Sequence, residues 1–375
     1  MTKKLHILFL CSWYPSRVLP TNGDFIQRHA EAVSLQHKVS VVHIISDKSI
    51  SKSKIELNTL NNVHTYIGYL KHTSNPFLKL LRYFNTYKRL LTQIGDFDLI
   101  HLNVLFPFGL LALHQKITKK KPFIISEHWT GYLKSQNHKI SASKKVLLKI
   151  ITKNAAFVCP VSNNLKNSML NFGLKGNYNP IPNVVDTDLF CPKTTDTPIF
   201  TIIHVSNMND EHKNISDMLR VARELEDKIP DFVWNFIGGE SDQFSQLIDQ
   251  LNFKRKSINF INHISQKELA TYFQNSDLFV LFSNYENLPC VILESFSSGL
   301  PVIATNVGGI SEYFPRDFGS LITKNNTEQL LEKIVNVYNN PIKDKIKMQL
   351  YAKNNFSKVE IATNFTELYH SALST

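Results

Sequence analysis

Residues 283–309 read SNYENLPCVILESFSSGLPVIATNVGG, and this segment predicts the order loop, helix, strand and turn. Pro289 favours the start of the helix, because its missing N–H would be unpaired at the first helical position anyway. Gly299 and Pro301 predict the end of that helix. The apolar residues 302–305 then predict a buried parallel strand. This order is typical of an open α/β sheet, which binds ligands at the carboxyl edge of its strands.

Two carboxylates mark the same segment. Glu286 lies in the loop before the helix, and Glu294 lies inside the helix with seven residues between them. Glu294 has apolar neighbours, a poor place for an ionised group that has no partner. The helix start also offers free N–H groups and a positive dipole end, which suit a phosphate. The spacing alone leaves a structural alternative open, in which one carboxylate caps the helix and the other is solvated.

The wider pattern of this segment resembles the donor-site signature of the family 4 retaining glycosyltransferases, glycosyl transferases group 1. The resemblance extends, more weakly, over nearly the whole chain, and it implies an α/β chain with the GT-B fold. That fold has two Rossmann-like domains with parallel sheets that face each other across a cleft. Asn287 stands where the family usually has a glycine. The pattern is Ser283-x2-Glu286-x2-Pro289-x4-Glu294-x4-Gly299-x-Pro301-Val302, then Gly308-Gly309-x2-Glu312.

The length of 375 residues suits two domains of ordinary size. We expect residues 1–185 to form an N-terminal Rossmann-like domain, with a last helix over 356–375 crossing back to it. Residues 186–355 are expected to form the second Rossmann-like domain, starting with a linker over 186–198. The resemblance implies that the first domain holds the acceptor and the second holds the nucleotide sugar.

Charge and targeting signals limit the partners and the cellular compartment that we expect for the protein. The net charge of +11 divides into +16 for residues 1–196 and −5 for the remainder, so an anionic partner is expected at the first half. No nucleic-acid motif accompanies this charge, and we expect no nucleic acid to bind. The apolar run near the N-terminus is short and interrupted by His6, so we expect no signal peptide. Four cysteines without a CxxC pair favour a reducing cytoplasm.

Two positions in the first domain are candidates for the donor site. Gly23 precedes a helix expected from about Phe25, where a glycine lets backbone N–H groups approach an anion; the alternative is a glycine that only makes the turn. His128 follows a strand expected over 122–126. The resemblance implies that Gly23 approaches the donor phosphates and that His128 contacts the donor sugar, with Glu127 as a weaker candidate.

The second domain carries the remaining candidates. Lys213 ends a polar loop that follows a strand expected over 200–205, and the resemblance implies that it clamps the leaving diphosphate. A merely solvated loop lysine is the alternative. Near Asn207, the segment Ser206–Met208 replaces the family's Gly-Arg, which removes one fixed charge. The resemblance also places near the nucleotide the end of a strand expected over 258–264 and the loop before the helix, that is His263, Ile264, Asn287, Leu288 and Pro289.

Three other segments carry expectations. Residues 46–62 are polar and are expected to form a surface loop. Residues 75–93 predict a helix with an apolar stripe and a basic face, which either packs on the sheet or rests on an anionic membrane; residues 144–153 predict a second basic helix. The DxD patterns at Asp96 and Asp186 are not expected to bind a metal in a GT-B protein.

The sequence therefore predicts an enzyme, a retaining hexosyl- or N-acetylhexosaminyltransferase. The resemblance implies a nucleotide-sugar donor, with a UDP-sugar favoured over a GDP-sugar, and no required metal or cofactor. A lipid-linked or cell-surface glycan acceptor fits the basic first half, as in bacterial capsule or lipopolysaccharide synthesis by a peripheral protein at the inner face of the membrane. The alternatives are a GT-B sugar-nucleotide epimerase and a non-catalytic nucleotide-sugar-binding protein.

Overall fold

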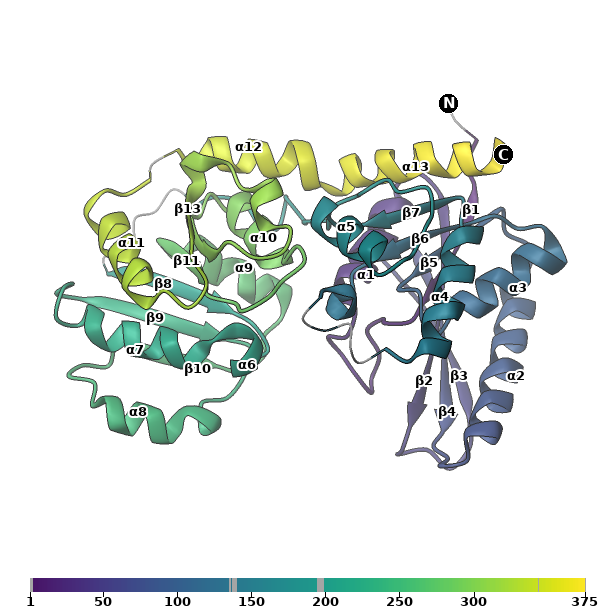
Figure 1. Cartoon of the computed structure of the whole chain (residues 1–375), viewed down its shortest axis with the longest axis horizontal. Helices are drawn as coiled ribbons and strands as arrows, with labels where there is room; N and C mark the ends of the chain where they lie inside the picture. The colour runs from purple at the N-terminus through teal and green to yellow at the C-terminus, as the bar shows by residue number, and fades with distance from the viewer. Residues whose placement is uncertain (1–2, 135, 137–139, 194–198, 343, 375) are drawn as a thin grey trace. The chain divides into compact units, whose positions relative to one another are not determined.

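The computed structural model of the protein describes residues 3–134, 136, 140–193, 199–342 and 344–374. The chain forms two compact units (Figure 1). Unit 1 comprises Met1–Val184 and Lys358–Thr375, and unit 2 comprises Val185–Ser357. Residues 194–198 of the expected linker lie outside the described residues.

Unit 1 is built on a seven-stranded sheet with the strand order β3-β4-β2-β1-β5-β6-β7. The pair β3–β4 is antiparallel, and the other described neighbours are parallel. Without β3, the order is that of a doubly wound Rossmann sheet. The strands stay parallel, and the order in which they are added reverses between β1 and β5. Its strands are β1 (His6–Cys11), β2 (Lys38–Asp47), β3 (Lys54–Leu60), β4 (Val63–Lys71), β5 (Leu99–Asn103), β6 (Phe123–Glu127) and β7 (Phe157–Pro160).

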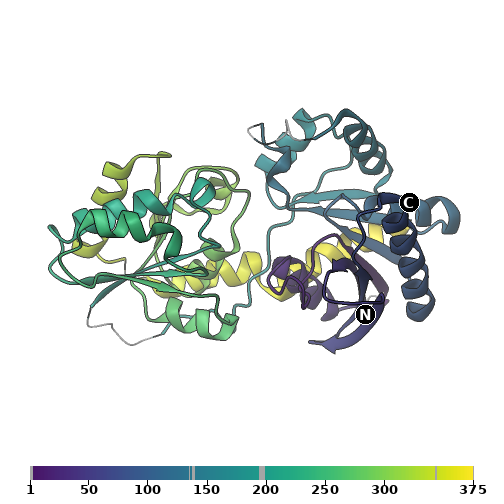
Figure 2. The same cartoon turned by 90° about the horizontal axis from the view of Figure 1, so that it is seen from below.

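Helices cover both faces of this sheet, as Figure 2 shows from below. They are α1 (Asp24–Ser34), α2 (Pro76–Ile94), α3 (Gly109–Lys119), α4 (Ala142–Asn154), α5 (Asn163–Asn171) and α13 (Lys358–Ser374). Side chains cap the starts of two of these helices: Asn75 accepts from the amides of Phe77 and Leu78 at the start of α2, and Ser162 accepts from the Leu165 amide at the start of α5.

The prediction of a surface loop over residues 46–62 is wrong. This segment contains β3, which pairs with β4 through a tight turn at Asn61 and Asn62, both with positive φ. Most of β3 is exposed because it is the edge strand of the sheet. An edge strand that buries neither face can carry polar residues throughout, so its sequence resembles that of a loop.

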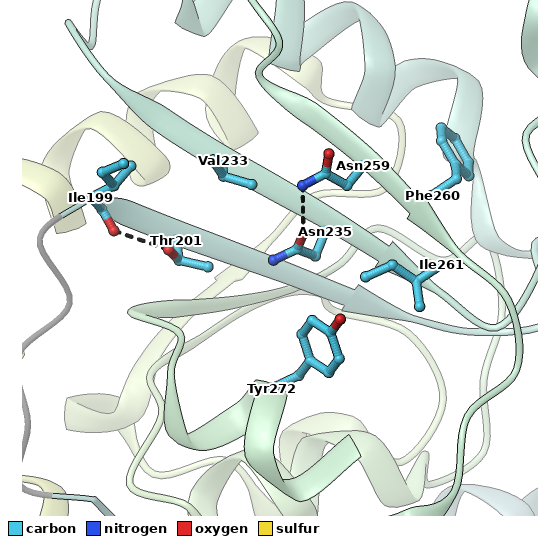
Figure 3. Close-up of a pocket in the computed structure, with 8 residues that line it drawn as sticks. All are labelled: Ile199, Thr201, Val233, Asn235, Asn259, Phe260, Ile261 and Tyr272. Atoms are coloured by element: carbon cyan, nitrogen blue, oxygen red, sulfur yellow. Dashed lines mark hydrogen bonds between the residues drawn. The ribbon is translucent and has the colours of Figure 1, made fainter. Parts of the chain in front are cut away.

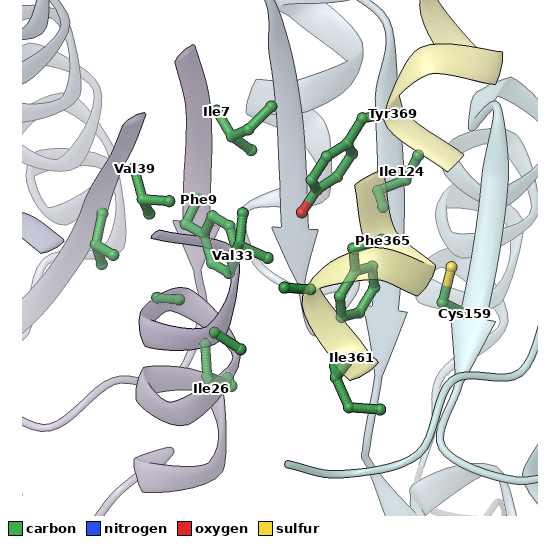
Figure 4. Packing of buried hydrophobic residues seen from close by; sticks show 14 of the residues in the cluster. Ile7, Phe9, Ile26, Val33, Val39, Ile124, Cys159, Ile361, Phe365 and Tyr369 are labelled. Carbon is green, nitrogen blue, oxygen red and sulfur yellow. The ribbon is translucent and has the colours of Figure 1, made fainter. Parts of the chain in front are cut away.

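The last helix belongs to the core of unit 1. In Figure 4, Phe365 and Tyr369 of α13 lie among residues of the central strands, including Phe9. The His101 ring lies 4.7 Å from the Phe365 ring, and its Nδ1 is 2.7 Å from the Tyr369 hydroxyl. Unit 1 is therefore completed by a segment from the far end of the chain.

Unit 2 is built on six parallel strands in the order β10-β9-β8-β11-β12-β13, the same doubly wound order with its reversal between β8 and β11. Its strands are β8 (Phe200–Val205), β9 (Phe232–Ile237), β10 (Ile258–Ile261), β11 (Leu278–Leu281), β12 (Val302–Thr305) and β13 (Gly319–Ile322). Its helices are α6 (Asp210–Lys213), α7 (Ile215–Leu225), α8 (Ser245–Leu251), α9 (Gln266–Gln274), α10 (Cys290–Ser297), α11 (Thr327–Asn339) and α12 (Lys345–Phe356).

Residues 283–309 fold as the predicted loop, helix, strand and turn. Pro289 is the N-cap of α10, so the helix begins one residue later than expected. Gly299 has φ +68° just beyond the C-cap Ser298, the left-handed conformation that ends many helices. The strand β12 (Val302–Thr305) is buried throughout, as its sequence predicts.

Candidate functional site

The candidate site of unit 2 lies where the strand order of its sheet reverses. The loop after β8 leads into the short helix α6, which ends at Lys213. The loop after β11 carries Glu286. Since β8 and β11 are parallel neighbours, these two loops meet at the carboxyl edge of the sheet. The structure thus brings together two of the predicted residues.

Lys213 and Glu286 form an ion pair at this position. Lys213 Nζ donates to Glu286 Oε1 at 2.5 Å, and the two side chains are 12% and 8% exposed. Burial would raise the pKa of Glu286, but the charge of Lys213 and the hydrogen bonds to the carboxylate outweigh it and lower that pKa. The Glu286 carboxylate is therefore ionised at neutral pH, and the ion pair lies at the point where a doubly wound sheet binds its ligand.

His212 and Tyr285 hold the two loops together, and sequence reasoning missed both. Their rings stack with centroids 4.2 Å apart, and His212 Nε2 donates to the Tyr285 carbonyl at 2.7 Å. The Asn284 amide donates to the His212 carbonyl, and the Asn284 side chain donates to the Glu211 carbonyl. Burial, with Lys213 nearby, lowers the pKa of His212, so its ring is neutral at pH 7. A stacked ring in a polar loop has no periodic pattern by which the sequence could reveal it.

A glycine turn after β12 packs against the backbone of the loop that carries Glu286. Gly308 has φ +61°, and a Cβ there would lie 2.0 Å from the Glu286 carbonyl oxygen. The Gly309 amide donates to the Asn287 carbonyl at 2.8 Å. Thr305 Oγ1 donates to the Ser283 carbonyl at 2.6 Å. The turn therefore needs a glycine both for its backbone conformation and for the close approach of the loop.

The segment that replaces the family's Gly-Arg has its own set of contacts. Ser206 Oγ lies 2.8 Å from His204 Nε2 and accepts from the Met208 amide at 3.1 Å. Met208 is buried with φ +55°, while Asn207 is exposed. The segment thus supplies no cation, and its conformation is fixed by a hydroxyl group and a buried thioether side chain.

The other predicted residues of unit 2 divide into two groups. Asn287 and Leu288 are buried in the loop before α10, and Glu294 is 1% exposed within that helix. His263 and Ile264 follow β10, which is an edge strand of the sheet, and β9 and β8 lie between β10 and the reversal point. They lie at the same carboxyl edge as Lys213 but on a different strand.

In unit 1, the predicted residues Gly23 and His128 lie at the carboxyl edge of the sheet. Gly23 has φ +77° at the start of α1, and a Cβ there would lie 2.7 Å from the carbonyl carbon of Trp13. The His128 ring lies 4.5 Å from the Phe25 ring and 5.4 Å from the His29 ring. Burial, with the neighbouring histidines, holds the pKa of His128 well below its usual value, so the ring is neutral at pH 7.

Glu127, the weaker candidate, is fully buried and acts on the backbone. Its Oε2 accepts from the Leu105 amide at 3.0 Å, and its Oε1 accepts from the amides of His128 and Trp129 at 2.9 and 3.0 Å. Burial raises the pKa of Glu127, although these hydrogen bonds oppose the rise. The side chain therefore joins the loops after β5 and β6 and fixes the backbone of His128.

The acidic patterns considered for a metal have protein partners. Asp98 Oδ2 accepts from the His6 amide at 2.7 Å, and Asp96 pairs with Lys121 at 2.8 Å, both just before β5 and thus at the amino edge. Asp186 Oδ1 accepts from the Leu189 amide at 3.2 Å. Among the described residues, no three His, Cys, Asp or Glu side chains gather as a metal site would require.

Comparisons with known families give two matches along the chain. Residues 27–189 match the model described as Glycosyltransferase Family 4. Residues 192–355 match the model described as Glycosyl transferases group 1. The first match covers most of unit 1 and extends five residues past its boundary at Val184, and the second lies within unit 2.

Curated proteins similar to this chain include glycosyltransferases of distant organisms. An uncharacterized glycosyltransferase of Methanocaldococcus jannaschii is 26% identical over 87% of this chain and 88% of its own length. The alpha-monoglucosyldiacylglycerol synthase of Acholeplasma laidlawii is 23% identical over 82% of each chain. An uncharacterized glycosyltransferase of Haemophilus influenzae is 28% identical, but the match spans only 38% of this chain and 40% of that protein.

Solved structures similar to this one share its architecture over nearly the whole chain. Sucrose-phosphate synthase from Thermosynechococcus elongatus has a TM-score of 0.78 at 18% identity and covers 99% of this chain and all of its own. Anabaena HepE in complex with UDP-glucose has a TM-score of 0.74 at 17% identity and covers 98% of this chain and all of its own. These similarities confirm the predicted α/β fold with two Rossmann-like halves of GT-B type.

Proposed function

Because this chain belongs to glycosyltransferase family 4 of the group 1 glycosyltransferases, we propose that it moves a sugar from a nucleotide-sugar donor to an acceptor hydroxyl with retention of the anomeric configuration. The observation that carries this proposal is the Lys213–Glu286 pair at the reversal point of the unit 2 sheet. A cation held there suits a diphosphate, and a carboxylate beside it suits sugar hydroxyls.

In the proposed reaction, the acceptor oxygen forms a bond to the anomeric carbon, and the bond from that carbon to the diphosphate oxygen breaks. The leaving diphosphate keeps the bonding electron pair and takes the proton of the acceptor hydroxyl on the same face of the sugar. Lys213 stabilises the negative charge that develops on the diphosphate. One such positioned donor typically contributes about 3–4 kcal/mol to the transition state.

The remaining predicted residues receive their roles from the family resemblance. Glu286 accepts from hydroxyls of the donor sugar, and Glu294 accepts from the ribose hydroxyls. The backbone of Gly23 and of the loop that ends at Pro289 approaches the phosphates. His128 contacts the sugar as a neutral ring, in keeping with its lowered pKa. His263 and Ile264 are placed beside the base by the same resemblance.

A UDP-sugar is the donor that we propose, with a GDP-sugar as the alternative. The similarity to HepE, whose structure holds UDP-glucose, supports this choice. A thermal-shift series with UDP-, GDP- and ADP-sugars tests it, since a ligand that binds the folded state raises the melting temperature. A UDP-sugar should raise it in the wild type and not in Lys213→Ala. Retained turnover in both Lys213→Ala and Glu294→Gln would remove the assigned roles.

We further propose a lipid-linked or cell-surface glycan intermediate as the acceptor, at an anionic membrane surface facing the cytoplasm. The support comes from α2, whose second half packs on the sheet through Thr86, Tyr87 and Leu90. Its first half is exposed, with Phe77 69% and Leu80 64% accessible. No acidic residue occurs between Glu56 and Asp96, whereas Lys79, Arg82, Lys88 and Arg89 all lie on this helix.

Exposed apolar side chains flanked by cations are typical of a helix that lies in the interface of an anionic bilayer. The similarity to a synthase named for a glycolipid product also supports this acceptor class. Within the described residues, no helix has the length and apolar content to span a membrane. Flotation with phosphatidylglycerol vesicles tests the proposal: binding that falls with salt supports it, and recovery only in the dense fraction contradicts it.

A further inference from the structure

A groove of unit 2 lies away from the reversal point, on one face of the sheet (Figure 3). It has a volume of about 620 Å³, within the range of small-molecule sites. Thr201 of β8, Val233 and Asn235 of β9, and Ile261 of β10 line it from the strands. Tyr272 rises from α9 towards Asn235, whereas Phe260 points away.

Two asparagines on this face are unusual for the fold. Strands of a doubly wound sheet are buried on both faces and are mainly apolar, and asparagine is depleted in strands. Yet Asn235 and Asn259 occupy the same register position on neighbouring strands. The alternate residues Trp234 and Phe236 point to the opposite face and stack in the core. The amide pair therefore marks this face as different from the rest of the sheet.

The polar groups of the groove have unused hydrogen-bonding capacity. Asn259 Nδ2 donates to Asn235 Oδ1 at 3.1 Å. Asn235 Nδ2 and Asn259 Oδ1 are not used by this hydrogen bond. Among the described residues, neither of these atoms nor the Tyr272 hydroxyl has a hydrogen-bond partner. Asn235 is only 8% exposed, yet it lines the groove, so its free amide nitrogen can be reached by a ligand there. The unused groups include both donors and acceptors.

The chemistry of the lining selects a class of ligand. Apart from the tyrosine hydroxyl, none of the eight lining side chains can ionise, so neither a phosphate nor an ammonium group would find a counter-charge. Amide groups and a tyrosine hydroxyl suit hydroxyls, which both donate and accept. Val233 and Ile261 offer apolar contact to C–H groups beside them. These features fit a neutral, hydroxyl-rich molecule.

We propose that this groove is a second carbohydrate site, which holds a neutral stretch of the acceptor or product glycan away from the donor. The choice of a glycan among neutral ligands rests on the proposed glycosyltransferase function. The groove would retain the glycan between successive encounters with the donor, because a chain bound at one point has a raised effective concentration at the other.

Saturation-transfer NMR without donor tests the proposal. The probes are maltotetraose, a β-1,4-galactotetraose and tri-N-acetylchitotriose, and the proteins are the wild type, the double variant Asn235→Ala/Asn259→Ala and Val233→Trp, which fills the groove. Gln250→Ala, which removes an exposed amide of α8 outside the groove, is the matched control. At least one probe should bind the wild type and the control, and both groove variants should weaken that binding about tenfold.

Donor binding separates this proposal from the proposed function. The groove variants should keep the thermal shift given by the nucleotide sugar, whereas Lys213→Ala should lose that shift and keep the oligosaccharide. The proposal is overturned if no probe binds the wild type at millimolar concentration, because the amides are then only hydrated. It is equally overturned if the groove variants bind as the wild type does, or if uridine or adenosine binds there in place of the oligosaccharides.

Discussion

Replacing Lys213 with methionine tests how much the Lys213–Glu286 pair contributes to stability and how much it contributes to transfer activity. The variant leaves the Glu286 carboxylate, 8% exposed, without its principal cation. Removing one partner of a buried ion pair typically costs about 3–5 kcal/mol. His212 Nε2 remains 3.5 Å from the same oxygen. We therefore expect Lys213→Met to lower the free energy of unfolding by about 3 kcal/mol, the lower end of that range.

The double variant Lys213→Met/Glu286→Gln removes both charges while keeping similar shapes. Its free energy of unfolding should lie close to that of the wild type, because a neutral replacement of a buried pair is often nearly neutral in stability. Because Lys213→Met should cost about 3 kcal/mol and the double variant close to nothing, the cycle of four proteins should give a coupling energy of at least about 3 kcal/mol. Urea denaturation at pH 7 measures each value. Lys347→Met, which breaks a surface pair with Asp317, is the control and should change stability little.

The same variants give a pH signature. The pKa of Glu286 is lowered in the folded protein, so the pair contributes fully above the ordinary glutamate value near 4.5 and loses its contribution as the pH falls through the folded-state pKa. The difference between wild type and Lys213→Met should therefore shrink below about pH 4.5. Transfer activity should fall by roughly 10²–10³ in both Lys213 variants. A double variant that recovers transfer, or single effects that simply add, would refute the reasoning.

Three further predictions concern other parts of the chain. Gly308→Ala should cost about 2–3 kcal/mol and weaken donor binding, because its Cβ meets the Glu286 carbonyl. Gly95→Ala, also at positive φ but with open space around it, should cost less than Gly308→Ala by the same denaturation assay, because it adds backbone strain without a clash. Burial lowers the pKa of His29 to about 4, so stability should fall as the pH drops from 6.5 towards 4, by about 3 kcal/mol for this group. His29→Phe should flatten that slope in thermal melts between these pH values, and an unchanged slope would contradict the assignment. Phe77→Glu/Leu80→Glu should abolish flotation with anionic vesicles while leaving the melting temperature within about 2 °C, since both side chains are exposed.

The sequence predicted best the elements that bury apolar runs. The strands β8 and β12 have the bounds expected, because each is a short, mainly apolar run. The edge strand β3 was missed because a strand that buries neither face needs no apolar alternation. Burial, rather than intrinsic strand propensity, was thus the signal that the sequence carried.

The site was predicted in part, for a similar reason. The family resemblance pointed to Lys213 and Glu286 separately, yet their contact spans 73 positions and arises only from the order of the strands. His212 and Tyr285 depend on that same contact, so no local pattern could reveal them. Asn235 and Asn259, by contrast, can be seen in the sequence as single amides within two apolar strands. Only the pairing of the strands shows that the two amides are neighbours.

Where the family resemblance implies Gly-Arg, the segment Ser206–Met208 is held by contacts that involve no cation. His204 Nδ1 donates to the Val280 carbonyl at 2.9 Å, so its Nε2 accepts from Ser206, whose oxygen in turn accepts from the Met208 amide. Asn207 is exposed, and its Oδ1 accepts from the Asn209 amide at 3.3 Å, a long hydrogen bond that any substitution at this position would remove. Asn207→Arg should therefore add a cation without repacking and tighten the binding of a nucleoside diphosphate about tenfold, as charge-assisted hydrogen bonds do. Calorimetric titration with UDP measures the change, with Asn207→Gln as the neutral control. Equal dissociation constants for the two variants would mean that position 207 does not face the diphosphate and that this loop is not its site.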